Sequence, residues 1–210
     1  MTNSLAKAQV RAVLDRLFSA AAEDAWPQSY PTDPQAHADA LAEVYMPISA
    51  DGGKLLYSLV RSARPETVVE FGTSFGISTI HLAAAVADNG KGHVYGSEMN
   101  AAKREAAQAN LNEAGLAGQV TVLPGDARES FADIRGPIGL VLLDGWKDLC
   151  LPVLQSLEPK LEPGALVVAD DVSFATMSDY LGYVRDPANG YVSVEFPVED
   201  GMEVSCYTGA

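Results

Sequence analysis

The pattern of apolar and polar positions predicts strands that alternate with helices through the middle of the chain. Short apolar runs rich in β-branched residues occur at residues 67–71, 93–97, 120–123, 138–143 and 165–169. Runs of this length and composition are typical of the buried strands of a parallel sheet. Helical patterns fill the intervals, at residues 82–87, 101–114 and 148–157. This alternation indicates an α/β fold.

The C-terminal part of the chain shows a different pattern. Residues 191–198 and 203–207 read as two strands joined through Glu199, Asp200 and Gly201. An Asp-Gly pair between two such strands is typical of an antiparallel hairpin. We therefore expect a Rossmann-like, doubly wound and mostly parallel sheet that ends in a C-terminal antiparallel hairpin.

Two helical segments precede the first strand. Residues 4–23 carry apolar side chains at helical spacing, with Ser4 in position to cap the helix, and residues 36–45 look like a second helix. A loop at 46–53 and a helix at 54–62 then lead into the strand. We expect one domain over residues 1–210, with residues 1–45 as an N-terminal helical addition. Such an addition packs on the core in most cases, but it can also cover a substrate or supply the contacts of a homodimer.

The composition narrows the class of protein. The net charge is −14 without any run of lysine or arginine, which argues against a large nucleic-acid interface. Cys150 and Cys206 are too few for a disulfide framework and form no CxxC metal pair. The first residues lack the apolar core of a signal peptide, and no apolar run reaches the length of a membrane span. The expectation is a reduced cytoplasmic protein.

A turn of small residues follows the first strand, where the sequence reads Glu70-Phe-Gly72-Thr-Ser74-Phe-Gly76. Glycines let the backbone pass close to a ligand, and open α/β sheets bind ligands at the carboxyl ends of their strands. The spacing does not match the fingerprint GxGxxG, which disfavours a nicotinamide-dependent oxidoreductase. An acidic-glycine turn of this form is more typical of a site for S-adenosylmethionine (SAM), although it also occurs where a strand and a helix simply pack closely.

Acidic residues end or closely follow every strand of the predicted parallel sheet: Glu70, Glu98, Asp126, Asp144 and the pair Asp170-Asp171. Each of them could simply cap the next helix. All of them lie on one rim of the sheet, however, where their mutual repulsion costs stability unless cations or hydrogen-bond donors compensate. We therefore interpret this rim as a ligand site.

The position of each carboxylate indicates what it could bind. Glu98 ends the second strand, where a carboxylate can accept both hydroxyls of a ribose. Asp126 could accept a hydrogen bond from an adenine amino group. Asp144, Asp170 and Asp171 come from neighbouring strands and could converge on one hard cation through oxygen ligands.

Three segments resemble a known family, the small metal-dependent class I SAM O-methyltransferases, which include catechol and caffeoyl-CoA O-methyltransferases. Residues 143–152 (LDGWKDLCLP) are similar to the LDHWKDxYLP motif of the catechol enzymes, and residues 97–100 (SEMN) to their EMN. Residues 48–53 (ISADGG) resemble the SADEG loop of the caffeoyl-CoA enzymes. The resemblance covers residues 46–171 well and the final hairpin loosely. It implies the class I methyltransferase fold and methyl transfer from SAM to a hydroxyl.

The resemblance also implies a set of cofactor-binding residues, which come from the loop at 46–53, the glycine turn and the ends of the later strands: Ile48, Ser49, Glu70, Gly72, Ser74, Gly76, Ser78, Glu98, Met99, Asp126, Ala127, Arg128, Asp144 and Trp146. The residues of the turn would line the methionine end of SAM. Glu98 would hold the ribose and Met99 would pack on the adenine. Residues 126–128 would rim the adenine pocket, and Trp146 would flank the cofactor.

A metal site and a catalytic base follow from the same resemblance. Asp144, Asp170 and Asp171 would hold Mg²⁺, with Mn²⁺ or Ca²⁺ as alternatives, and Lys147 would be the catalytic base beside Asp144. A divalent ion bound by two vicinal oxygens of the acceptor would lower the pKa of one hydroxyl. A neighbouring cation and partial burial would depress the pKa of Lys147 and let it take the proton.

Two departures from the family pattern bear on the metal and on the acceptor. The family usually has Asp-Asn where this chain has Asp170-Asp171, so the site is more anionic. The catechol enzymes carry a glutamate near the final hairpin that contacts the second hydroxyl, but Val194 aligns there and Glu195 lies one position out of register. A shift of one residue turns a strand side chain to the other face. The expected acceptor is a vicinal diphenol or a similar small molecule, and no membrane partner is expected.

Two other functions stay open. Some bacterial relatives methylate a modified hydroxyuridine in tRNA, an activity that the charge of −14 opposes. A noncatalytic SAM-binding protein is the other alternative, and the retention of Lys147 with all three carboxylates disfavours it. His37, His81 and His93 are expected to be structural or exposed.

Overall fold

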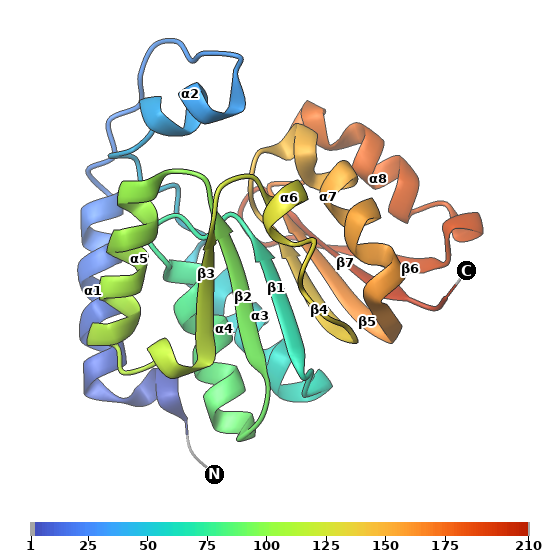
Figure 1. Ribbon diagram of the computed structural model, residues 1–210, viewed down its shortest axis with the longest axis horizontal. Helices are drawn as coiled ribbons and strands as arrows, with labels where there is room; N and C mark the ends of the chain where they lie inside the picture. Colours follow the sequence, from blue (N-terminus) through green and yellow to red (C-terminus); the bar gives the residue numbers. More distant parts are fainter. Residues whose placement is uncertain (1–2, 210) are drawn as a thin grey trace.

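A twisted sheet of seven strands forms the centre of the part of the chain that the computed structural model describes, residues 3–209 (Figure 1). The strands are β1 (Thr67–Phe71), β2 (His93–Glu98), β3 (Val120–Pro124), β4 (Ile138–Leu143), β5 (Leu161–Asp170), β6 (Tyr191–Phe196) and β7 (Met202–Tyr207). Their order in the sheet is β3-β2-β1-β4-β5-β7-β6. The first five strands pair in parallel, and β7 pairs antiparallel with both β5 and β6. The predicted mostly parallel sheet with a C-terminal hairpin is therefore confirmed.

Helices cover both faces of the sheet. One face carries α1 (Ala8–Ala21), α3 (Ala50–Ala63), α4 (Ile77–Asn89) and α5 (Ala101–Glu113). The other face carries α6 (Ala127–Ser130), α7 (Cys150–Leu157) and α8 (Ser178–Val184) (Figure 1). Successive strand residues point to opposite faces, so Val68 and Leu142 join the first core while Val69 and Val141 join the second. This alternation explains why the strands read as continuous apolar runs.

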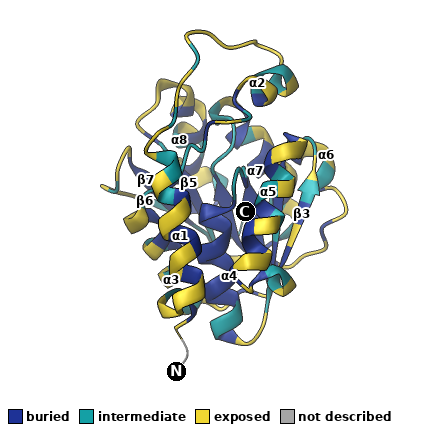
Figure 2. Cartoon of the chain, turned by 90° about the vertical axis from the view of Figure 1, so that its left-hand side faces the viewer, coloured by how far each residue is buried: buried dark blue, intermediate teal, exposed yellow. Residues whose placement is uncertain are grey.

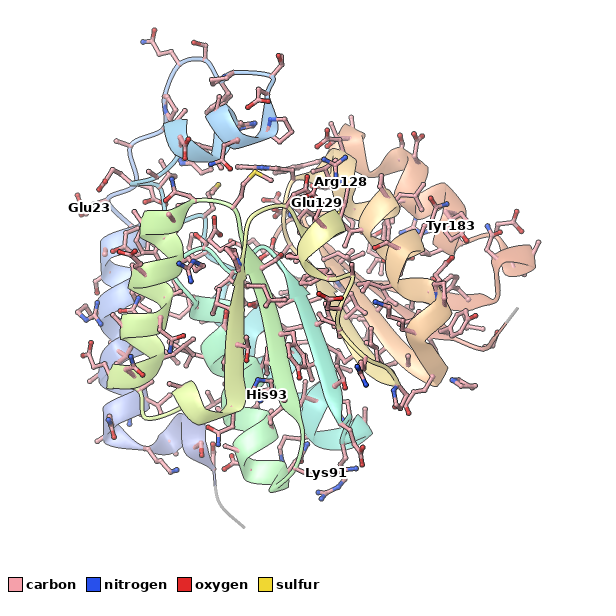
Figure 3. The ribbon with its side chains drawn as sticks, viewed as in Figure 1. Glu23, Lys91, His93, Arg128, Glu129 and Tyr183 are labelled. Atoms are coloured by element: carbon pink, nitrogen blue, oxygen red, sulfur yellow. The ribbon has the colours of Figure 1, made fainter. Side chains whose placement is uncertain are left out.

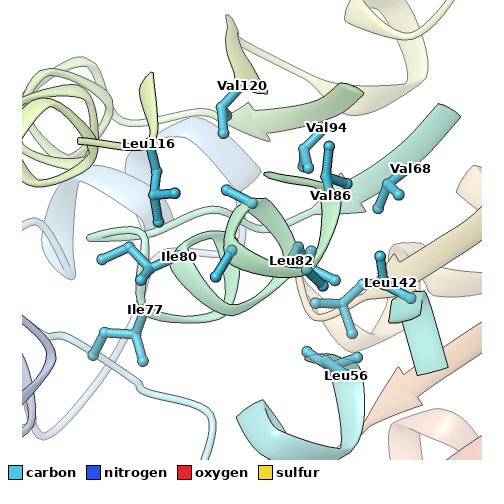
Figure 4. Close-up of a cluster of buried hydrophobic side chains, with 14 of the residues drawn as sticks. Leu56, Val68, Ile77, Ile80, Leu82, Val86, Val94, Leu116, Val120 and Leu142 are labelled. Carbon is cyan, nitrogen blue, oxygen red and sulfur yellow. The ribbon is translucent and has the colours of Figure 1, made fainter. Parts of the chain in front are cut away.

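The core on the first face is built around α4, whose side chains meet those of α3 and of the strands (Figure 4). Ile80 and Leu82 are fully buried there, and α4 is dark blue along most of its length in Figure 2. Truncating a buried leucine of this kind to alanine costs about 2–5 kcal/mol. The strand–helix unit that carries the glycine turn is therefore anchored firmly at its helical end.

The N-terminal segment differs from the sequence prediction in two places. The prediction that Ser4 caps the first helix was wrong, because its backbone N–H and its hydroxyl donate to Asp88 on α4, at 2.7 Å each. The second helix, α2 (Pro34–Ala40), begins and ends earlier than predicted. Asp33 caps this helix. The backbone N–H of Tyr45 donates a hydrogen bond to the carboxylate of Asp24, so this tertiary contact replaces the helical hydrogen bond that the prediction expected there. Figures 1 and 2 both show α2 projecting beyond one end of the sheet.

Other boundaries also differ from the prediction. Helix α3 begins at Ala50 rather than Lys54, since the Ser49 hydroxyl accepts a hydrogen bond from Gly52 and caps the helix. Strand β5 begins before the predicted residues, and the short helices α6 and α8 carried no clear signal. The prediction of one domain over residues 1–210 includes Met1, Thr2 and Ala210, which lie outside the described residues. Among the helices of residues 3–209, none combines the length and apolar character needed to cross a membrane.

Candidate active site

A cavity of about 480 Å³ opens at the carboxyl ends of the parallel strands. Its walls come from several parts of the chain, among them the N-terminal segment around α2, the glycine turn after β1, the ends of β2, β4 and β5, and the turn of the final hairpin. Cavities of this size at this edge of an α/β sheet are typical of sites for small molecules. The rim interpreted as a ligand site in the sequence therefore does enclose one cavity.

The glycine turn forms the floor of this cavity. Gly72 has a φ of 97°, and a side chain there would collide with the backbone carbonyl of Asp144. Ser74 also has a positive φ of 46°, which is unusual for a residue other than glycine. The turn is fixed to β2 by a hydrogen bond of 3.0 Å from Thr73 N–H to the carbonyl of Ser97. Its tight conformation thus brings the backbone of β1 against the end of β4.

Glu70 lies beneath the turn rather than in the cavity wall. It is fully buried and accepts hydrogen bonds from the hydroxyls of Thr73, Ser78 and Thr79, at 2.6–2.8 Å. Burial raises the pKa of Glu70 to about 7, against the lowering effect of these three donors. Glu70 therefore braces the turn and the start of α4 from inside the core.

Glu98 stands at the end of β2, where its side chain is largely buried but lines the cavity. One carboxylate oxygen accepts the backbone N–H of Ser74 and the other that of Asn100, both at 2.8 Å. Each carboxylate oxygen has a further lone pair, so Glu98 can still accept hydroxyl donors from a ligand. The backbone bonds fix the direction in which it does so.

Three aspartates meet at the ends of β4 and β5. Asp144, Asp170 and Asp171 place one carboxylate oxygen each within 4.8 Å of the others. Asp171 has a φ of 56°, and this left-handed conformation brings two adjacent carboxylates into one cluster. Three carboxylate oxygens at such separations form a donor set that suits a hard divalent cation. The three aspartates predicted to bind a metal are therefore brought together in the structure.

Lys147 lies against this cluster. Its ammonium is 3.0 Å from Asp144 and 2.9 Å from Asp171. Burial lowers the pKa of Lys147, but the two carboxylates outweigh that effect and raise it above its ordinary value. In the protein alone, Lys147 is thus a protonated counterion, whereas we expected from the sequence that its pKa would be depressed beside a bound cation. The difference arises because the expected cation would take over the charges that Lys147 now neutralises.

Burial and the crowding of these carboxylates raise the pKa values of two of the aspartates themselves. Burial, reinforced by the neighbouring carboxylates, raises the pKa of Asp170 to about 8. Burial also raises the pKa of Asp144 to about 6, although the Lys147 ammonium opposes it. One ammonium does not balance three carboxylates, so the cluster holds protons that a divalent cation would displace. The charge as well as the geometry of the site therefore fits such a cation.

Aromatic side chains from the N-terminal segment cover one side of the cavity. His37 on α2 stacks between Tyr30 and Trp146, at ring-centroid distances of 5.0 and 4.2 Å. Trp26 and Phe174 also line the cavity and are 57% and 47% exposed. Exposed aromatic residues that gather around a cavity are typical of ligand sites. His37 was expected to be structural or exposed, and the structure places its ring in the cavity wall.

Most of the predicted cofactor-binding residues line this cavity: Ile48, Gly72, Ser74, Ser78, Glu98, Met99, Ala127, Asp144 and Trp146. Five do not. Ser49 caps α3, Glu70 braces the turn, and Gly76 is the N-cap residue that precedes α4. Asp126 caps α6 and binds the guanidinium of Arg128, at 2.5 Å, so the capping role that the sequence left open for it is the one observed. Arg128 nevertheless lies at the cavity end of the molecule, whereas His93 lies at the opposite end (Figure 3). The adenine contacts predicted for residues 126–128 stay predictions.

Several residues that line the cavity were not predicted from the sequence. Lys103 reaches the cavity from α5, and Glu199 and Asp200 reach it from the hairpin turn. Backbone hydrogen bonds from Val172 and Ser173 to Gly201 and Asp200 hold that turn against the loop after β5. An isolated lysine within a helix and two acidic residues in a turn carry no motif, so no local signal marked them.

Comparisons with known proteins agree with this geometry. A family described as a methyltransferase domain matches residues 69–172. Catechol O-methyltransferase B of Danio rerio is 30% identical over 178 residues, which cover 78% of this chain and 66% of that protein. Catechol O-methyltransferase of Mus musculus is 28% identical over 198 residues, which cover 85% of this chain and 74% of that protein. The chain thus spans just under two thirds of the zebrafish protein and about three quarters of the mouse protein.

The fold has solved counterparts. The O-methyltransferase TomG from Streptomyces achromogenes, involved in tomaymycin synthesis and solved in complex with SAM, superposes with a TM-score of 0.64. The two chains are 24% identical, and the superposition covers 97% of this chain and 100% of TomG. The fold, the matched domain and the catechol-type relatives agree with the resemblance seen in the sequence motifs. The chain carries a methyltransferase domain over residues 69–172, and it is similar in sequence and in fold to the class I SAM-dependent O-methyltransferases.

Proposed function

We propose that the protein transfers a methyl group from SAM to one hydroxyl of a vicinal diphenol or a similar small acceptor, with the help of a divalent cation. One observation carries the proposal: the glycine turn, Glu98, the three aspartates and Lys147 contribute to the walls of a single cavity. A cofactor on the turn would therefore lie next to an acceptor on the aspartates. Methyl transfer needs this adjacency, because it joins two bound molecules directly.

The cofactor side is suited to hold SAM in a fixed direction. The backbone of the glycine turn would approach its methionine end, and Glu98 would accept the ribose hydroxyls. Both groups are already held in place by the chain, since Glu98 is bonded to Ser74 and Asn100. Little ordering would then be needed on binding, and preorganisation of this kind favours affinity.

The acceptor side supplies the proton chemistry. Asp144, Asp170 and Asp171 would hold Mg²⁺ or a similar hard ion, and such an ion supplies Lewis-acid polarisation of a hydroxyl. Lys147 would accept the hydroxyl proton at its Nζ. Its pKa is raised by Asp144 and Asp171, so it becomes a base once those carboxylates are engaged elsewhere. The burial that remains then favours the neutral amine.

The charged residues on the acceptor side of the cavity indicate which class of acceptor should bind there. Glu199 and Asp200 also line the cavity and bring two further carboxylates to it, while the ammonium of Lys147 contacts two members of the aspartate cluster. A bound divalent cation would still leave the acceptor side negative. We therefore expect neutral or amine-bearing diphenols to be better acceptors than carboxylate-bearing ones, because the latter would meet like charge. The aromatic wall of Trp26, Tyr30 and Phe174 suits the ring of such an acceptor.

The test combines binding with turnover. Calorimetric titration should detect binding of SAM and of its product S-adenosylhomocysteine, and none of NADH. A methyl-transfer assay across neutral, amine-bearing and carboxylate-bearing diphenols, with a monophenol as control, should then give methyl ethers of the diphenols in the presence of Mg²⁺. Binding of NADH alone, or binding of SAM without transfer to any hydroxyl, would refute the proposal.

A further inference from the structure

Lys103 on α5 is a nearly buried lysine in the cavity wall, with 3% of its surface exposed. Its ammonium donates to the carbonyl of Val44 at 2.7 Å and to the hydroxyl of Ser74 at 3.3 Å. It also lies 5.4 Å from the centre of the Phe75 ring. All of these partners are neutral. An ammonium has three N–H donors, so one remains for a ligand.

This lysine lacks the charge partner that buried ammonium groups normally have. Within residues 3–209, it takes part in none of the ion pairs closer than 4.0 Å. Glu98 acts on it only over a longer distance, and the oxygens of that carboxylate are engaged by Ser74 and Asn100. Lys147, by contrast, contacts two carboxylates. A buried charge without a partner is costly, and a bound anion would relieve that cost.

The position of Lys103 indicates which anion this is. Its contact with Ser74 places it at the glycine turn, on the cofactor side of the cavity and away from the aspartate cluster. SAM carries a sulfonium, an ammonium and one carboxylate, which is its sole anionic group. We propose that the Lys103 ammonium binds the methionine carboxylate of SAM, an assignment that rests on the proposed cofactor. Lys103 would then be a cofactor-binding residue that none of the sequence motifs includes.

The surroundings of Lys103 support this role. Burial lowers the pKa of Lys103 below its ordinary value, while Glu98 and Asp24 oppose that effect. A carboxylate in contact would stabilise the charged form further. Lys103 also holds the Val44 carbonyl, while the Ser74 hydroxyl donates to the carbonyl of Tyr45 at 2.8 Å. Cofactor binding at this point would therefore also tighten the segment that leads from α2 into the cavity wall.

The test uses two ligands that differ only in the carboxylate. S-adenosylhomocysteine and its decarboxylated analogue, S-adenosyl-3-thiopropylamine, are titrated calorimetrically into the wild type and into Lys103→Met. Loss of a charge-assisted contact should weaken binding of S-adenosylhomocysteine about 10- to 100-fold. Binding of the decarboxylated analogue should stay within about twofold or become tighter, because its ammonium no longer faces Lys103. Arg104→Met, which removes a neighbouring charge on the same helix, should leave both affinities unchanged.

The outcomes separate this role from the proposed function. If Lys103→Met binds S-adenosylhomocysteine as the wild type does, or loses both ligands equally, Lys103 does not bind the carboxylate. If the wild type binds no S-adenosylhomocysteine, the proposed function fails together with this role. Lys103→Gln keeps a donor for Val44 and should show the same selective loss, so the test stands even if the methionine variant does not fold.

Discussion

The two sides of the cavity satisfy their charges in different ways. On the cofactor side, Glu98 accepts two backbone N–H groups and Glu70 accepts three hydroxyls, so the chain itself completes both carboxylates. On the acceptor side, three aspartates lie together, the ammonium of Lys147 contacts two of them, and the pKa values of Asp144 and Asp170 are raised. The chain therefore completes the carboxylates of the cofactor side, whereas those of the acceptor side lack positive charge that a bound cation would supply under the proposed function.

Backbone strain is common to both sides. Four residues other than glycine line the cavity with positive φ values: Met46 (47°), Ser74 (46°), Asp171 (56°) and Glu199 (52°). Each such conformation costs roughly 1–3 kcal/mol and persists where the surroundings hold it. Four of the five described residues other than glycine that have a positive φ thus lie in the cavity wall, and Arg64 is the exception.

The largest effect should come from removing a carboxylate on the acceptor side. Asp170→Ala should lower turnover about 10³-fold or more, because cation-assisted activation of the hydroxyl is lost. Binding of S-adenosylhomocysteine should change by less than about fivefold, since the cofactor side is complete without Asp170. Steady-state kinetics and calorimetry measure the two effects. Asp148→Ala, an exposed aspartate next to Lys147, is the control and should leave turnover within about twofold.

If the turnover of Asp170→Ala stayed within tenfold of the wild type, the acceptor side would not depend on its carboxylates in the way proposed here. An equal loss of cofactor affinity and turnover would contradict the division between the two sides, because it would show that both sides form one cooperative unit.

Lys147→Met should separate the role of Lys147 as a base from the binding of the cation. Turnover should fall about 10²–10⁴-fold if Lys147 takes the proton. Calorimetric affinity for Mg²⁺ should rise, however, because the ammonium that competes for Asp144 and Asp171 is gone. Lys147→Arg keeps the positive charge but not a usable base, so it should lose turnover without gaining cation affinity. Near-normal turnover in Lys147→Met would leave the cation alone to activate the hydroxyl.

The buried carboxyl of Glu70, on the cofactor side, should make the free energy of unfolding depend on pH. Burial raises the pKa of Glu70 from 4.5 to about 7 in the folded protein. The protonated carboxyl therefore stabilises the fold fully below pH 4.5, and this stabilisation is lost as the pH rises to about 7. The loss amounts to about 3 kcal/mol in the free energy of unfolding. Urea unfolding of the wild type and of Glu70→Gln between pH 5 and 8 should show this slope in the wild type alone. Parallel profiles for the two proteins would show that Glu70 does not titrate on unfolding.

Glu98 should give the smallest effect. Glu98→Ala should weaken binding of S-adenosylhomocysteine by several-fold to about a hundredfold, since two charge-assisted hydrogen bonds to the ribose are lost. Turnover at saturating SAM should fall much less, because the acceptor side is untouched. Glu105→Ala, on the exposed side of α5, is the control for the change in net charge. Unchanged affinity in calorimetry would remove Glu98 from the cofactor site.

Much of this arrangement could be predicted because it is local in the sequence. The strands follow from β-branched runs, and Asp144 and Asp170 follow from their places at the strand ends. Parallel strands bring those ends to one edge, so the aspartate cluster could be inferred without any knowledge of contacts. The fold and the aspartate cluster were therefore accessible from the pattern alone.

The parts that could not be predicted depend on contacts between distant segments. Helix α2 ends early because Asp24 binds the backbone of Tyr45, and Lys103 lies in the cavity wall because Val44 accepts its ammonium. His37 reaches Trp146 only once the N-terminal segment folds over the sheet. Hydrophobic periodicity carries no information on such hydrogen bonds and stacks, because they join residues that are far apart in the chain.

Under the proposed function, the acceptor side needs a divalent cation and the cofactor side does not. Removing bound ions with EDTA, and measuring transfer of labelled methyl from SAM to a vicinal diphenol before and after Mg²⁺ is added back, tests both halves of this statement. We expect no product after chelation, full recovery with Mg²⁺, and the same calorimetric affinity for S-adenosylhomocysteine in both states. An undiminished rate of transfer after exhaustive chelation would contradict it.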